Sequence, residues 1–297
     1  KMLQILFMYA LSTFPLTSAL LYYTQPLFLL GTRMTIAGLL LLSYSALRKR
    51  FLVNRDHMWL YGQIILFAIF IPYCLRYWGL QHAPAQRAYL LYNLGPVVTY
   101  LMTIFLAIEI MNWKKSVAIV LSMIGFIFYI DAPLNAYLYP SFGLPEIALI
   151  LSVICFSYGW IVIRKLITQL HYSATMVNGI AMLGGGSLGL CATALFETYP
   201  LVTDTIQFMV GLIALILISN CYVHNLYASL LKSYSLTFLQ LGSLLAPLMS
   251  RSVYIALGHE QLTSAFCVSI LLIITGFLIY YWQDRKQESV TTESVKA

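Results

Sequence analysis

The sequence predicts an all-α integral membrane protein with ten transmembrane helices arranged as a 5+5 inverted repeat. Three observations lead to this fold class. The 297 residues are 61% hydrophobic and only 9% charged, whereas a soluble domain carries roughly a quarter charged residues. Apolar runs of about 20 residues, the length that crosses a hydrocarbon core of about 30 Å, follow one another through the chain. Finally, the stretch 96–125 recurs 151 positions later at 247–276.

Ten apolar runs are long enough to span a membrane. They are residues 2–22, 27–47, 57–79, 84–107, 113–130, 144–168, 173–197, 205–228, 233–256 and 262–282. The first run is interpreted as a membrane helix, because it is long for the core of a signal peptide and the alternation of charge requires it. Only the segment after Tyr281 is polar enough to predict a disordered tail, at 283–297.

Basic residues follow every second predicted span, which orients the chain. They are Arg48, Lys49, Arg50, Arg55, Lys114, Lys115, Arg164, Lys165, Lys232, Arg285 and Lys286. The opposite loops at 131–145 and 198–204 contain no Lys or Arg. The positive-inside rule therefore predicts that both termini are cytoplasmic. The net charge of +7 is explained by this topology, and no nucleic-acid partner is expected.

Residues of four types recur at the same offset of 151 positions in the two copies of the repeat. The pairs are Pro96 and Pro247, Glu109 and Glu260, Gly125 and Gly276, and Tyr129 and Tyr280. Because each copy has five spans, an odd number, the second copy enters the membrane from the opposite face. Such an inverted repeat is typical of transporters. The predicted organisation is a first repeat at 1–131, a connecting loop at 132–143, a second repeat at 144–282 and the tail.

Several sequence patterns match motifs of other protein classes but lack the structural context that those motifs need. The residues 184–189 match the glycine pattern of a dinucleotide-binding motif, but they lie inside a predicted span, where close packing of helices through small residues explains them better. Glu109 and Glu260 lie at span ends and are interpreted as structural, although proton carriage stays open. The five cysteines lack metal-site spacing. We therefore expect no metal, no cofactor and no catalytic residues.

The span 84–107 carries the pattern Ala83-Pro84-Ala85, Gly95-Pro96 and Glu109. The second copy keeps Pro247, Glu260 and Gly276 but has Tyr234-Ser235-Leu236 in place of the Ala-Pro-Ala. With the ten spans, this pattern resembles the EamA-like branch of the drug/metabolite transporter superfamily. The resemblance implies a secondary transporter in a bacterial inner membrane, with spans 1, 3, 4, 6, 8 and 9 around a central cavity.

Polar and aromatic residues line two related spans and predict a substrate site. Gln240, Ser243, Pro247 and Arg251 share one helical face, because residues three and four apart are neighbours on a helix. The predicted substrate-binding residues are Tyr9, Tyr89, Tyr92, Asn93, Tyr158, Asn220, His224, Gln240, Ser243 and Arg251. Pro96 and Pro247 are predicted hinges, while a purely structural bend stays open.

An aromatic cavity with one cation suits a small zwitterion that carries a ring, and Arg251 is expected to hold its carboxylate. Within the family, the resemblance implies S-adenosylmethionine exchanged for S-adenosylhomocysteine, as in members from intracellular bacteria, or an aromatic amino acid. The expected partners are this small molecule and the lipid bilayer, with the chain as a monomer or a homodimer. A channel, a non-transporting membrane sensor and a membrane enzyme remain alternatives.

Overall fold

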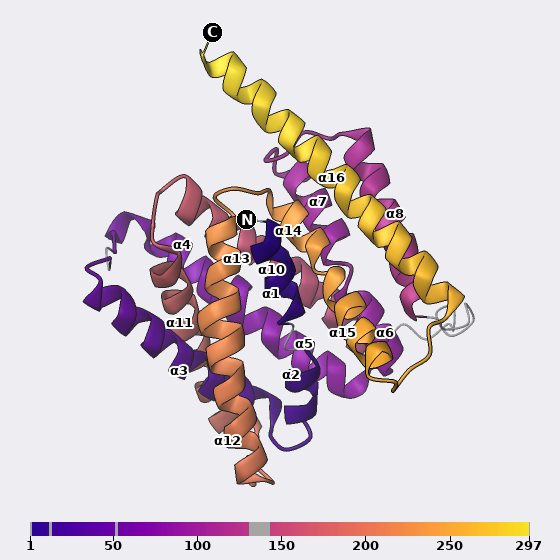
Figure 1. Ribbon diagram of the computed structural model, residues 1–297. Helices are drawn as coiled ribbons and strands as arrows, with labels where there is room; N and C mark the ends of the chain where they lie inside the picture. Colours follow the sequence, from indigo (N-terminus) through magenta and orange to yellow (C-terminus); the bar gives the residue numbers. More distant parts are fainter. Residues whose placement is uncertain (1, 12–13, 51–52, 131–142, 297) are drawn as a thin grey trace. The chain divides into compact units, whose positions relative to one another are not determined.

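The computed structural model describes residues 2–11, 14–50, 53–130 and 143–296 (Figure 1). Within these ranges the regular structure is helical, apart from one isolated β-bridge between Thr24 and Val202. The predicted all-α class is therefore confirmed. The predicted connecting loop at 132–143 lies outside the described residues, except for Gly143.

Eight helical segments of the described chain are long and apolar enough to cross a membrane. They are Pro26–Leu47, Arg55–His82, Arg87–Phe105, Trp113–Ile130, Leu144–Thr168, Ala174–Phe196, Thr205–Leu230 and Ser264–Lys286. The predicted count of ten spans is not confirmed, because the runs 2–22 and 233–256 are not among these segments. For the other eight runs, the predicted bounds agree with the observed ones to within a few residues.

The helices group into two compact units, and each unit takes segments from both halves of the sequence. Unit 1 comprises residues 1–10, 84–142 and 234–297. Its helices are α1 (Met2–Ala10), α6 (Ala85–Tyr92), α7 (Gly95–Phe105), α8 (Trp113–Ile130), α14 (Leu236–Gly242), α15 (Leu245–Ala256) and α16 (Ser264–Lys296). Within it, α8 and α16 lie side by side, and α14 packs on α7 (Figure 1).

Unit 2 comprises residues 11–83 and 143–233. Its first part contains α2 (Phe14–Leu20), α3 (Pro26–Leu47), the short 3-10 helix η1 (Arg55–His57), α4 (Met58–Gln63), the π-helix η2 (Ile64–Phe70) and α5 (Ile71–His82). Its second part contains α10 (Leu144–Thr168), α11 (Ala174–Phe196), α12 (Thr205–Ala214), the π-helix η3 (Leu215–His224) and α13 (Asn225–Leu230). The main packing partners are α3 with α11 and α5 with α10.

Irregular features of the backbone recur at the same 151-residue offset as the sequence repeat. The π-helix η2 begins at Ile64, and η3 begins at Leu215. α7 and α15 both end at a residue with positive φ, which is Ala107 (53°) in one copy and Gly258 (78°) in the other. In each case the left-handed residue caps the helix and lets the next amide bond back to the last turn. The duplication therefore extends from residue types to local conformation.

The predicted hinge prolines lie just after a break in the helix. α6 ends at Tyr92 and α7 begins at Gly95, so Pro96 occupies the first turn of α7. α14 and α15 are divided in the same way before Pro247. A proline in the first turn loses no helical hydrogen bond, because the N–H there has no partner within the helix. The sequence predicts a bend within a continuous helix, and the structure has a break.

Glycines allow two helix pairs to approach closely. A Cβ atom at Gly31 of α3 would lie 2.7 Å from the backbone nitrogen of Leu190 on α11. Gly186, within the run 184–189, faces the backbone of Thr35 on α3 just as closely. This contact supports the interpretation of that run as a packing surface. In unit 1, the repeated glycines Gly125 and Gly276 serve the same purpose between α8 and α16.

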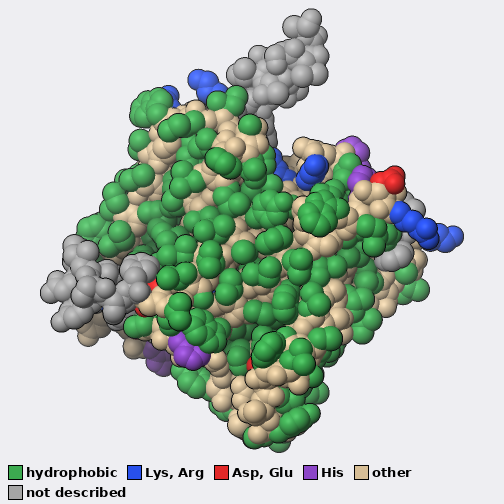
Figure 2. Space-filling view, turned by 180° about the vertical axis from the view of Figure 1, so that it is seen from behind, with side chains coloured by type: hydrophobic (Ala, Val, Ile, Leu, Met, Phe, Trp, Pro, Cys, Tyr) green, Lys and Arg blue, Asp and Glu red, His purple; other side chains and the backbone are tan. Residues whose placement is uncertain are grey.

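The surface of the protein is apolar, as expected for contact with lipid. Figure 2 shows hydrophobic side chains over most of the face that it draws. Large apolar side chains such as Leu47 and Phe105 remain more than four-fifths exposed, which water would penalise and lipid would not. The last helix, α16, has its bounds at Ser264 and Lys296, and the disorder of the tail at 283–297 stays a prediction. No Gly or Pro follows Gly276 to end that helix.

Candidate substrate-binding site

A buried arginine organises the polar centre of unit 2. Arg33 lies on α3 and is only 2% exposed. Its Nε donates to Asn220 Oδ1 at 2.7 Å, Nη1 donates to the Tyr77 hydroxyl at 3.1 Å, and Nη2 donates to Ser219 Oγ at 2.8 Å. Three hydrogen bonds to two other helical segments fix the plane of the guanidinium. Asn220 turns its amide nitrogen to the sulfur of Met34 at 3.1 Å.

The π-helix η3 explains why these partners lie where they do. A π-turn is wider than an α-turn and leaves carbonyl groups without their usual helical donors where it ends. Side chains occupy those carbonyls: His224 Nδ1 bonds to the Ser219 oxygen at 3.0 Å, and Asn225 Nδ2 donates to the Cys221 oxygen at 2.9 Å. Asn178 of α11 donates to the His224 oxygen at 3.1 Å. The sequence-predicted pair Asn220 and His224 is thus part of one network.

The network determines the tautomer of His224. Because Nδ1 faces a carbonyl oxygen, Nδ1 carries the proton, and Nε2 accepts from the Tyr73 hydroxyl at 3.3 Å. Both ring nitrogens then have partners, so the orientation of the His224 ring is fixed. The Trp160 ring lies 5.9 Å from the His224 ring.

Aromatic rings and a second arginine border the same network. Arg76 of α5 lies with its Cζ 4.0 Å from the centre of the Tyr73 ring, while Arg33 lies 5.9 Å from that ring. Tyr77 meets Tyr73 edge to face, at 5.7 Å between ring centres. Phe156 of α10 closes the group, 6.4 Å from Tyr73. Arginine over a ring face is a favourable cation–π arrangement.

Arg76 lies near the end of a span, where an arginine can reach the membrane interface, but only 9% of it is exposed. Tyr73 and Tyr77 flank its guanidinium instead. Burial beside aromatic rings replaces part of the hydration that the interface would provide.

The remaining unit 2 residue among the predicted binding residues is Tyr158 on α10. Its ring meets Phe67 of η2 edge to face at 5.4 Å. The backbones of these segments approach closely because Gly159 faces the backbone of Ala68. Tyr158 is half-buried.

The predicted residues of unit 1 gather around the breaks in its two divided helices. Tyr9 of α1 donates to the Leu239 carbonyl oxygen. Asn93 follows α6 and donates to the Tyr89 oxygen at 2.8 Å, and Ser243 follows α14 and donates to the Gln240 oxygen at 2.7 Å. Each of the two side chains thus occupies a carbonyl of the last turn before a break.

Three further predicted residues of unit 1 have aromatic surroundings or lie near a helix break. The Tyr89 ring lies 5.7 Å from Phe126 and 6.2 Å from Tyr129. Tyr92 is the last residue of α6 and is half-buried. Gln240 faces Gly95 of α7, where a Cβ atom would be 3.0 Å from its amide oxygen.

Arg251 already has an acidic partner. Its Nε donates to Glu260 Oε2 at 3.0 Å, and its Nη1 donates to the Tyr129 carbonyl oxygen at 3.1 Å. The Phe266 ring lies 5.0 Å from its Cζ. The sequence predicts that Arg251 receives a substrate carboxylate. In this conformation Glu260 occupies that role.

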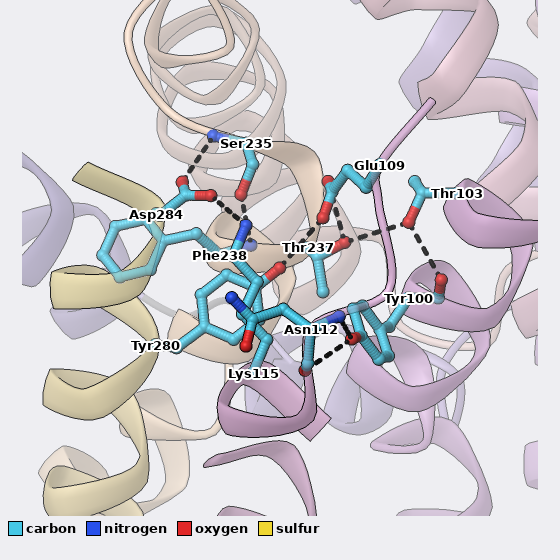
Figure 3. Close-up of polar contacts among 10 residues, drawn as sticks. All are labelled: Tyr100, Thr103, Glu109, Asn112, Lys115, Ser235, Thr237, Phe238, Tyr280 and Asp284. Carbon is cyan, nitrogen blue, oxygen red and sulfur yellow. Dashed lines mark hydrogen bonds and ion pairs between the residues drawn. The ribbon is translucent and has the colours of Figure 1, made fainter. Parts of the chain in front are cut away.

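The first-copy counterpart of Glu260 makes a related contact (Figure 3). Glu109 accepts a hydrogen bond from Thr237 Oγ1 at 3.2 Å and another from the Tyr280 hydroxyl at 3.0 Å. Tyr280 is the repeat counterpart of Tyr129, whose carbonyl accepts from Arg251. Each repeated glutamate therefore belongs to a polar tie that ends on the last long helix of the opposite sequence half. We call these contacts the Glu109 tie and the Glu260 tie.

A buried ion pair adjoins the Glu109 tie (Figure 3). Lys115 Nζ lies 2.7 Å from Asp284 Oδ1 and 5.1 Å from the centre of the Tyr280 ring. The other carboxylate oxygen of Asp284 accepts from the Ser235 amide at 3.3 Å. Because Lys115 is 1% exposed, the pair is shielded from water. It joins α8 to α16 and to the start of α14.

Part of the chain is similar to a known transporter family. Residues 2–130 match the model of the EamA-like transporter family. The matched part includes Arg33, Tyr73, Arg76 and the first helix break, while Asn220 and His224 lie beyond it.

Curated relatives extend the similarity over most of the chain. A protein of Chlamydia muridarum named S-adenosylmethionine/S-adenosylhomocysteine transporter is 27% identical over 284 residues, which is 93% of this chain and 89% of the relative. A Chlamydia trachomatis protein of the same name is 27% identical over 95% of this chain and 88% of the relative. One solved crystal structure has a TM-score of 0.76 at 18% identity and covers 96% of both chains. Both named relatives are transporters.

The predicted binding residues do not include Arg33, Arg76, Tyr77 or Ser219. The charge of Arg33 and Arg76 is a signal in the sequence, because an arginine inside a span must find partners or reach the interface. Tyr77 and Ser219 carry no such signal, since tyrosine and serine are frequent in this chain. Their role depends on which helices pack together.

Proposed function

We propose that this protein exchanges S-adenosylmethionine for S-adenosylhomocysteine across a membrane by alternating access. The observation that carries the proposal is the similarity to two chlamydial transporters of these compounds over 93% and 95% of the chain. Both compounds carry an adenine ring and an amino-acid group with a carboxylate. Aromatic faces beside a buried cation, as in the Arg33 network, suit such molecules.

The predicted lining of the site remains our proposal, with one change of role. We retain Tyr9, Tyr89, Tyr92, Asn93, Tyr158, Asn220, His224, Gln240 and Ser243 as lining residues. Asn220 and His224 are supported by their place in one buried network. We assign Arg251 to the Glu260 tie, because a substrate would have to displace a carboxylate that is already bound to it.

The two ties support the proposal of alternating access. They lie at repeat-related positions, so an inverted repeat would place them toward opposite ends of unit 1. One tie would open as the other closes, and the helix breaks before Pro96 and Pro247 would accommodate the bending. In this proposal the protein lies in a bacterial inner membrane with both termini in the cytoplasm, as the basic residues favour.

Counterflow into liposomes tests this function. Purified protein is reconstituted with S-adenosylhomocysteine inside, and entry of labelled S-adenosylmethionine is followed. We expect saturable entry that requires the internal compound. Tyr92→Ala should reduce it at least about fivefold, because a stacking ring contributes about 1–3 kcal/mol to the binding of an aromatic base. The control is Tyr22→Ala, since Tyr22 is 85% exposed and should leave the rate unchanged.

Other results would identify other functions. Entry driven by internal tryptophan but not by S-adenosylhomocysteine would indicate an aromatic amino acid carrier. An ion current that does not saturate would indicate a channel. Ligand binding without any entry would indicate a sensor.

A further inference from the structure

We propose that Arg33 holds the carboxylate of the transported amino-acid-type compound, so that unit 2 contains an anion subsite that does not involve Arg251. This inference rests on the proposed function, because it assigns one substrate group within that site. It concerns the α-carboxylate alone and makes no use of the adenine ring.

The first argument is charge. Arg33 is 2% exposed, and its hydrogen-bond partners within the described chain are an amide, a phenol and a hydroxyl, all neutral. A buried cation without an anion is unfavourable, since neutral dipoles replace only part of its hydration. A second arginine, Arg76, lies beside the same Tyr73 ring as Arg33 and adds to the positive potential there. An anionic ligand group would lower the free energy of this arrangement.

The second argument is the number of donors. A guanidinium has five N–H groups, and three of those on Arg33 bond to Asn220, Tyr77 and Ser219. One N–H on each terminal nitrogen makes no hydrogen bond to the described residues. Two N–H groups are the number that a carboxylate accepts in a paired arrangement. The three existing bonds would hold those groups in place before the ligand arrives.

The third argument is depth. Arg33 lies seven residues after Pro26, where α3 begins, which places it about 10 Å along the helix. An alternating-access carrier binds its substrate near the middle of the membrane, so that each side can reach the site in turn. A group at the membrane surface is accessible from one side only. By contrast, Arg251 is already paired with the carboxylate of Glu260, whose side chain is 47% exposed. Arg33 is therefore the better anchor.

Binding measurements on the purified full chain in detergent test the assignment. The probes are S-adenosylhomocysteine, its carboxamide, and 5′-methylthioadenosine, which lacks the amino-acid group. Arg33→Gln should weaken binding of S-adenosylhomocysteine about tenfold or more, since bonds to a charged group are lost. Binding of 5′-methylthioadenosine should change less than about threefold. The matched control is Arg48→Gln, because Arg48 is an exposed arginine on the same helix segment.

Arg33→Lys keeps the proposal testable if the glutamine variant does not fold. Lysine retains the charge but has no planar fork. The preference of the protein for carboxylate over carboxamide should fall at least about fivefold. An unchanged preference would overturn the proposal, as would an equal loss for S-adenosylhomocysteine and 5′-methylthioadenosine.

Three further outcomes are distinguishable. If the wild type binds none of the probes, the proposed function itself fails. If Arg251→Gln removes the carboxylate preference and Arg33→Gln does not, Arg251 is the anchor. If chloride stabilises the wild type against heat, while Arg33→Gln abolishes that effect without changing the carboxylate preference, the site holds an inorganic anion and the proposal is wrong.

Discussion

The buried ion pair between Lys115 and Asp284 provides a quantitative test of the packing of α8 against α16. Lys115→Met removes the cation and leaves Asp284 buried at 8% exposure. At the observed 2.7 Å, two unit charges attract by about 6 kcal/mol for an effective dielectric constant of about 20. Desolvation offsets much of this attraction. Removal of one partner costs more than the pair contributes, because the other charge stays buried.

We therefore expect Lys115→Met to lower the free energy of unfolding by about 3 kcal/mol. Asp284 keeps the Ser235 amide as a partner, which places the loss toward the lower end of the usual range. The measurement is reversible unfolding in mixed detergent micelles. Lys114→Met is the control, since Lys114 is exposed and should change stability by less than about 0.5 kcal/mol.

A double-mutant cycle separates the pair from other effects of the substitution. Lys115→Met and Asp284→Asn are measured alone and together. The coupling energy should reach at least about 1.5 kcal/mol, because the two groups contact each other directly. Additive losses, or equal effects of Lys115→Met and Lys114→Met, would refute the reasoning that this pair is buried and coupled.

Three other predictions concern stability and binding. Gly31→Ala should lower the free energy of unfolding by at least about 1–3 kcal/mol, because the added Cβ would lie 2.7 Å from the Leu190 nitrogen. The control is Gly62→Ala, whose added Cβ would have no atom within 4 Å and which should be neutral or slightly stabilising in the same unfolding measurement. Glu197→Ala should cost about 1–3 kcal/mol, since its carboxylate accepts from the first amides of α3 at 2.6 and 2.8 Å; an unchanged unfolding curve would contradict this. Arg251→Gln should change the dissociation constant of S-adenosylhomocysteine by less than about threefold in a binding assay, and a tenfold loss would restore Arg251 as the anchor.

The sequence predicts local features well because they depend on short stretches of chain. The apolar runs at 113–130 and 144–168 have the same bounds as α8 and α10. The repeat offset found in Pro96 and Glu109 also relates the two π-helices and the two positive-φ helix ends. Length, hydropathy and spacing are properties of the chain itself, so no tertiary information is needed to read them.

The candidate site was predicted only in part. Asn220 and His224 are one turn apart on one run, and in the structure both belong to the network around Arg33. The helix breaks at Asn93 and Ser243 were predicted as continuous helices, because a proline in a spanning run indicates a bend as readily as a break. The choice between the two depends on side chains that bond to the freed carbonyls.

The sequence by itself determined that this chain is apolar, duplicated and all-helical, with segments long enough to span a membrane. Only the tertiary structure decided the partners of its charges. Arg33 and Arg251 look alike in the sequence, since each is an arginine inside an apolar run. Folding gives Arg251 a glutamate nine residues away and gives Arg33 only neutral groups from distant helices. The physical reason is that a buried charge is defined by what surrounds it, and those neighbours come from segments far apart in the chain.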